Sequence, residues 1–116
     1  MKVKNKIVLI FIAVLLSVCF VSAGLAMEKG NKRKGKYLYR KVWKACHERG
    51  EIDSPKPRLN PDDHTQAEWE AIFNQKNFSE FGCKEEWSAA SEQDLADIFT
   101  HMYEHASDSP TPAKCN

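Results

Sequence analysis

The sequence predicts a small all-α domain that follows an N-terminal export signal. Three stretches of the chain repeat apolar residues at spacings of three and four, which is the periodicity of one face of a helix. Two of these stretches open with residues that cap helix N-termini. No stretch alternates apolar and polar residues for long enough to predict a strand.

The first predicted helix covers residues 36–47, which contain neither glycine nor proline. Its apolar stripe consists of Leu38, Val42 and Ala45, with Tyr39 and Trp43 beside it. Residues 27–35 before it are basic and contain two glycines, so we expect a flexible lead-in to a domain that spans residues 36–116. After it, three prolines in residues 54–61 exclude regular structure.

The second predicted helix covers residues 66–75. Thr65 and Glu68 fit a capping box at its start. Its apolar positions are Trp69, Ile72 and Phe73. Residues 83–90 are expected to form a short helix or turn that places Trp87.

The third clear helix is predicted from Ser91 to Ala106, where a turn-forming run begins. Ser91 and Asp94 repeat the N-terminal capping pattern. The apolar face continues through Leu95, Ile98, Phe99 and Met102.

Residues 1–26 have the pattern of a secretory signal peptide. Three lysines precede an apolar run of about 15 residues, which is shorter than the roughly 20 that a membrane-spanning helix needs. Small residues stand at the two expected cleavage points, after Ala23 and after Ala26. We therefore expect a periplasmic or secreted protein without stable membrane insertion after cleavage.

Charge is distributed unevenly along the mature chain. Without the three signal lysines, 14 basic residues face 16 acidic ones, a net charge near −2. Residues 27–58 carry 11 basic and 4 acidic side chains, whereas residues 59–116 carry 3 basic and 12 acidic ones. This polarity can orient the protein toward charged partner proteins, and nothing in it predicts nucleic-acid binding.

No phosphate-binding loop or Ser/His/Asp arrangement is present, so we do not expect an enzyme.

The run Trp43-Lys44-Ala45-Cys46-His47 closes the first predicted helix. This run resembles the haem-attachment motif C-x-x-C-H of the single-haem c-type cytochromes of anaerobic bacteria. Position by position, Cys46 matches the second attachment cysteine, which forms a thioether, and His47 matches the proximal axial ligand. Trp43 replaces the first attachment cysteine. The order of loops and helices from residue 36 to residue 115 is similar to that family as well.

The resemblance implies one haem c per chain, held through a single cysteine, and electron transfer with redox partner proteins. For the distal axial position we favour His105, with His64 as the weaker candidate. Met102 continues an apolar stripe and is assigned to the core. His101 and His105 lie four residues apart, a spacing that also suits a divalent metal.

A domain of this size needs stability beyond its core, and an exported chain can form disulfides. We predict a disulfide between Cys83 and Cys115, because the mature chain has an odd number of cysteines and its exposed proline-rich tail has little else to hold it. Cys46 is then left over for haem. Two other interpretations remain open. One is a haem-less cytochrome-like module for partner binding or assembly, and the other is a small Cys/His metal-binding protein.

Overall fold

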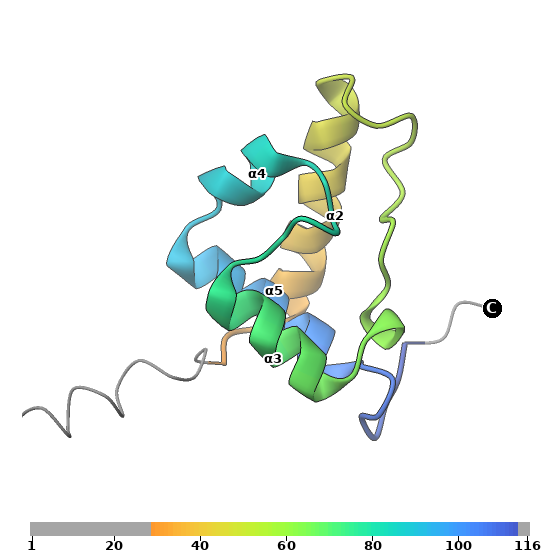
Figure 1. Ribbon diagram of the computed structural model, residues 1–116, viewed down its shortest axis with the longest axis vertical. Coiled ribbons are helices and arrows are strands. Elements are labelled where there is room, and N and C mark those ends of the chain that lie inside the picture. The colour runs from red at the N-terminus through yellow and green to blue at the C-terminus, as the bar shows by residue number, and fades with distance from the viewer. Residues whose placement is uncertain (1–28, 114–116) are drawn as a thin grey trace, which may run out of the picture.

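The computed structural model describes residues 29–113, which form four α-helices, one short 3-10 helix and no strand (Figure 1). The elements in chain order are α2 (Lys32–Glu48), η1 (Pro61–Asp63), α3 (Gln66–Gln75), α4 (Lys84–Ala89) and α5 (Glu92–Glu104). The predicted all-α class is confirmed. The predicted signal peptide over residues 1–26 and Cys115 lie outside the described residues.

Helix α5 lies at the centre of the arrangement. It packs against α2, α3 and η1, while α4 packs against α2 (Figure 1). Eight consecutive α5 residues, from Leu95 to Met102, are buried, although its polar positions Asp97, Thr100 and His101 are among them. Buried polar groups need hydrogen-bond partners, and those of Asp97 and Thr100 come mainly from α2 and the segment before it.

Helix α2 begins four residues earlier than predicted, so the expected flexible lead-in is wrong over residues 32–35. The side chain of Asn31 caps the helix by accepting hydrogen bonds from the main-chain N–H groups of Arg33 and Lys34. Gly35 is buried where α2 crosses α5. The glycine that indicated a loop therefore permits close packing of two helices.

The predicted caps of α3 and α5 are present. Thr65 and Glu68 form a complete capping box, with the Thr65 hydroxyl accepting from the Glu68 N–H and the Glu68 carboxylate accepting from the Thr65 N–H. Ser91 accepts a hydrogen bond from the N–H of Asp94 at 3.1 Å. Local sequence thus places both helix starts, and α3 has the predicted bounds.

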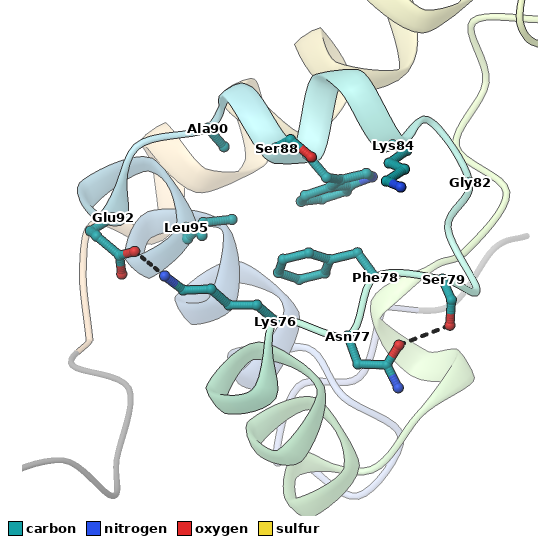
Figure 2. A pocket seen from close by; sticks show the side chains of 11 residues that line it. Lys76, Asn77, Phe78, Ser79, Gly82, Lys84, Ser88, Ala90, Glu92 and Leu95 are labelled. Atoms are coloured by element: carbon teal, nitrogen blue, oxygen red, sulfur yellow. Dashed lines mark hydrogen bonds and ion pairs between the residues drawn. The ribbon is translucent and has the colours of Figure 1, made fainter.

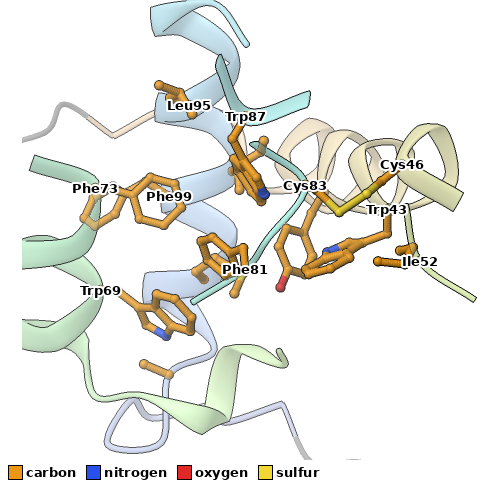
Figure 3. Packing of buried hydrophobic residues seen from close by; sticks show 14 residues of the cluster. Trp43, Cys46, Ile52, Trp69, Phe73, Phe81, Cys83, Trp87, Leu95 and Phe99 are labelled. Carbon is orange, nitrogen blue, oxygen red and sulfur yellow. A yellow bond between two sulfur atoms is a disulfide. The ribbon is translucent and has the colours of Figure 1, made fainter. Parts of the chain in front are cut away.

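Aromatic rings from all four α-helices meet in one core (Figure 3). Phe81, in the loop before α4, lies at its centre and is 1% exposed. It stacks on Trp69 at 5.9 Å and on Trp87 at 4.6 Å between ring centroids. The largest fully buried aromatic side chains are Trp43, Trp69, Phe73 and Phe81. This core joins α2, α3, α4 and α5 into one body.

Among residues 29–113, no helix combines the length and apolar character that crossing a membrane requires.

Candidate functional site

Cys46 and Cys83 form a disulfide bond that joins α2 to the start of α4 (Figure 3). Their Cα atoms are 5.7 Å apart, and both side chains are buried. Cys83 adopts the left-handed conformation (φ 51°), which turns the chain from the preceding loop into α4. The predicted Cys83–Cys115 bridge is therefore replaced by Cys46–Cys83. The prediction rested on the odd cysteine count and on a tail with little else to hold it, and neither reveals that Cys83 lies beside Cys46.

The two haem-attachment positions do not fit a covalently bound haem. The sulfur of Cys46 is bonded to Cys83 and has no thiol to offer a vinyl group. Trp43 is fully buried and packs edge-on against Tyr39 at 5.9 Å and against Phe81 at 6.2 Å between ring centroids. A side chain that the resemblance places beside haem is instead part of the protein core.

His47 keeps one property of an axial ligand. Its Nδ1 donates a hydrogen bond to the carbonyl oxygen of Ile52 at 2.9 Å, which leaves Nε2 as the unprotonated nitrogen of the neutral ring. Histidines that bind metals in proteins are commonly oriented in this way. His47 is half-buried at the end of α2, next to the disulfide in sequence.

The predicted distal candidates have other partners. His64 Nε2 lies 2.6 Å from a carboxylate oxygen of Glu80, and His64 Nδ1 lies 3.5 Å from one of Glu68. Burial alone would lower the pKa of His64, but the two carboxylates outweigh it and raise the pKa. His105 Nδ1 donates to the carbonyl oxygen of Thr111 at 2.8 Å. Met102 is fully buried in the core, as predicted.

One group of three potential metal ligands occurs within residues 29–113, formed by Cys46, Cys83 and Glu86. Two of its members are bonded to each other, so the group offers no thiolate while the disulfide is intact. Glu86 is also engaged, because its carboxylate accepts two hydrogen bonds from the guanidinium of Arg49, at 3.0 and 2.8 Å. This cluster serves to hold α2 and α4 together.

A pocket of about 370 Å³ lies between α2, α5 and the proline-rich segment. Helix α2 supplies Lys36, Tyr39 and Arg40, and α5 supplies His101 with His105 at its C-cap. The Tyr39 hydroxyl donates to the carbonyl oxygen of Leu59 at 2.5 Å and so fixes the outer wall. The remaining lining residues are Pro57, Asn60, Pro61 and Ala113.

Four of the residues that line this pocket, Lys36, Arg40, His101 and His105, have basic side chains. The rings of His101 and His105 are 5.4 Å apart between centroids. The pKa of His101 is lowered to about 4, mainly because the ring is buried and in smaller part because His105, Lys36 and Arg40 lie nearby. Neighbouring cations also oppose the binding of a divalent metal by these two histidines. The sequence singled out this histidine pair but not its basic surroundings.

A second hollow, of about 740 Å³, opens between α3, α4 and the start of α5 (Figure 2). Phe78 and Trp87 form its aromatic wall, with ring centroids 4.9 Å apart. Two pairs of polar side chains on its rim already bind each other. Lys76 forms an ion pair with Glu92, and the Ser79 hydroxyl donates a hydrogen bond to Asn77. We take the basic pocket as the candidate functional site because its charged groups lack such partners.

No protein-family model, curated protein sequence or solved structure matches the chain. The likeness to c-type cytochromes therefore stays a prediction from the residues that carry it.

Proposed function

We propose that the mature chain is an extracytoplasmic binding module that works without covalent haem and converts no substrate. The observation that carries this proposal is the Cys46–Cys83 disulfide, which occupies the one sulfur available for haem attachment. Disulfides form and persist in oxidising compartments, which agrees with the predicted export signal. The ligand-binding region is the basic pocket between α2 and α5.

The burial of Trp43 supports the same proposal. A haem positioned by the C-x-x-C-H motif would lie against this part of α2, but the indole fills the space between Tyr39 and Phe81. Trp43 stands at the position of the first attachment cysteine and adds an aromatic ring to the core there. The core is therefore complete without a cofactor. The helical architecture then supports recognition of a ligand at its surface.

The decisive experiment is export of the full precursor in cells that also carry a cytochrome c maturation system. We expect a colourless protein with the mass of the processed chain and no haem-sized addition. A c-type cytochrome expressed in the same cells is the control for maturation. The Trp43→Cys variant, which restores C-x-x-C-H, tests whether the missing cysteine alone accounts for the result. A Soret band and a haem-sized mass increase in the unaltered protein would contradict the proposal.

A second candidate function is favoured by His47. Its Nδ1 bond to Ile52 prepares Nε2 for a metal, as the single-haem electron carrier would require. Cys46 would first have to be freed from Cys83 by reduction, and only one thioether could form. The same export experiment decides between the two functions, because only the electron carrier is red.

A further inference from the structure

Two pairs of basic side chains from different helices meet at the pocket between α2 and α5. Lys36 and Arg40 are four residues apart on α2, and His101 and His105 are four residues apart on α5. Residues at this spacing lie on the same helix face, one turn apart. The crossing of α2 and α5 brings the two faces to a single hollow, which neither helix would form alone.

Three of these four side chains, Lys36, Arg40 and His101, have no hydrogen-bond or ion-pair partner among the described residues. Lys36 and Arg40 make no ion pair or hydrogen bond within residues 29–113. His101 is 8% exposed, and its ring nitrogens make no hydrogen bond within the same residues. The nearby carboxylate of Asp63 is already bonded to the N–H of Asn60 at 2.7 Å. A largely buried imidazole and two exposed, unpaired cations beside one hollow favour a ligand that accepts hydrogen bonds and carries negative charge.

We propose that this pocket binds a dianionic tetrahedral oxyanion of the phosphate or sulfate type. Lys36 and Arg40 carry two positive charges that match the two negative charges, and the neutral ring of His101 can donate one further hydrogen bond from its N–H. The Nδ1–H of His105 already donates to the carbonyl oxygen of Thr111. Arginine presents parallel donors that suit two oxygens of such a group, which makes Arg40 the main anchor. This inference deepens the proposed binding function by naming the chemical class of its ligand.

The pocket has room for more than an inorganic ion. Its volume of about 370 Å³ is several times that of a small ion, since a water molecule takes about 30 Å³ in the liquid. The Tyr39 ring and the two prolines of the wall supply apolar surface beside the basic groups. A phosphate or sulfate ester of a small organic molecule therefore fits as well as the free ion, and the two sources share one recognition chemistry.

Titration calorimetry on the mature, disulfide-bonded chain, in a buffer free of phosphate, tests the proposal. The probes are inorganic phosphate, sulfate, phenyl phosphate and acetate. We expect heat from the three dianions and none from acetate at the same concentration. If phenyl phosphate binds more tightly than inorganic phosphate, the ligand is an ester. If the two bind equally, the ligand is the free ion.

Variants on α2 connect the binding to the pocket. Arg40→Gln should weaken phosphate binding about tenfold, because it removes a charge-assisted donor pair. Lys44→Gln on the same helix is the matched control, since Lys44 is exposed and does not line the pocket. Both variants should unfold at the same urea concentration as the parent. Glutamine is a good helix former, so loss of the fold will not explain loss of binding.

Nuclear magnetic resonance gives a second readout, since phosphate should shift the ring resonances of His101 and His105 but not those of His64. Three outcomes would overturn the proposal: no binding at millimolar phosphate or sulfate, equal binding of acetate, or equal affinity of the Arg40→Gln and Lys44→Gln variants. None of these outcomes depends on colour or haem mass, so they are separate from failure of the proposed function.

Discussion

Gly35 of α2 lies directly against the main-chain carbonyl group of Asp97 in α5, with no room between them for a side chain. A Cβ built on Gly35 would overlap the carbonyl oxygen of Asp97 and lie 3.0 Å from the main-chain nitrogen of Ile98. The obstacle is backbone, which cannot move aside as a flexible side chain could. The crossing of the two helices that form the basic pocket therefore depends on this glycine.

We predict that Gly35→Ala destabilises the fold by about 2 to 3 kcal/mol. In an isolated helix the same substitution would stabilise by about 1 kcal/mol, so the sign distinguishes the packing effect from helix propensity. Urea denaturation followed by circular dichroism measures the change. Lys44→Ala, at an exposed position of α2, is the control and should change stability by less than about 0.5 kcal/mol. A stabilised Gly35→Ala variant would show that the helices do not cross here.

Asp97 is expected to hold the first turn of α2 in place. Its side chain is 2% exposed, lies 3.9 Å from Lys34 Nζ and accepts hydrogen bonds from the Asn31 N–H at 2.8 Å and from Gln93 Nε2 at 3.1 Å. Asp97→Ala leaves these donors without an acceptor, and we expect a loss of about 2 kcal/mol. Asp97→Asn keeps an acceptor oxygen and should lose less.

Hydrogen exchange locates the effect of the Asp97 substitutions. Amides in the first turn of α2 should exchange faster in Asp97→Ala, while those of α3 keep their protection relative to global stability. Uniformly faster exchange throughout the domain would show that Asp97 supports the whole core rather than the end of one helix.

The sequence predicted what local chemistry determines. Thr65 with Glu68 and Ser91 with Asp94 form their caps within a few residues, so the starts of α3 and α5 were foreseen. The start of α2 was missed because Gly35 in a basic segment looks like a loop until Asp97 is known to lie beside it. A pattern over a few neighbouring residues cannot reveal a contact between residues more than sixty positions apart, such as Gly35 and Asp97.

The same limit applies to the candidate site. The sequence assigned Cys46 to haem attachment and Cys83 to a disulfide with Cys115, whereas their pairing with each other depends on α4 lying along α2. It also identified His101 and His105 as a pair four residues apart. Their role changes once Lys36 and Arg40 are found in the same pocket, which only the crossing of α2 and α5 reveals.

The Cys46–Cys83 disulfide is expected to contribute about 4 kcal/mol to stability in the loop-entropy model. The two cysteines are 37 positions apart, so the bridge closes a long loop of the unfolded chain. The double variant Cys46→Ala/Cys83→Ala should unfold at a correspondingly lower urea concentration. Treating the parent with a reductant should give a similar loss without any substitution.

Peptide mapping without reduction checks the pairing itself. Digestion should release one linked fragment that contains Cys46 and Cys83. A fragment that joins Cys83 to Cys115 would contradict the structure and restore the pairing predicted from the sequence.

Finally, His101 should make the fold sensitive to acid. Burial, followed by the nearby cations, lowers the pKa of His101 to about 4, against an ordinary value of 6.5. In the unfolded chain the ring takes up its proton near pH 6.5, whereas in the folded protein it does so only near pH 4. Between these values the unfolded state binds more protons, so this contribution to stability is present above pH 6.5 and is lost as the pH falls toward 4.

The test is urea denaturation at a series of pH values from 7 to 4, in buffers free of phosphate and sulfate. The parent should lose stability over this range more steeply than His101→Gln, which has no titrating group at this position. His64 acts in the opposite direction, because its raised pKa adds stability as the pH falls. His64→Gln is therefore the matched control and should steepen the loss. If the parent and His101→Gln gave parallel curves, His101 would have to titrate alike in the folded and unfolded chain, and its burial between α2 and α5 would be wrong.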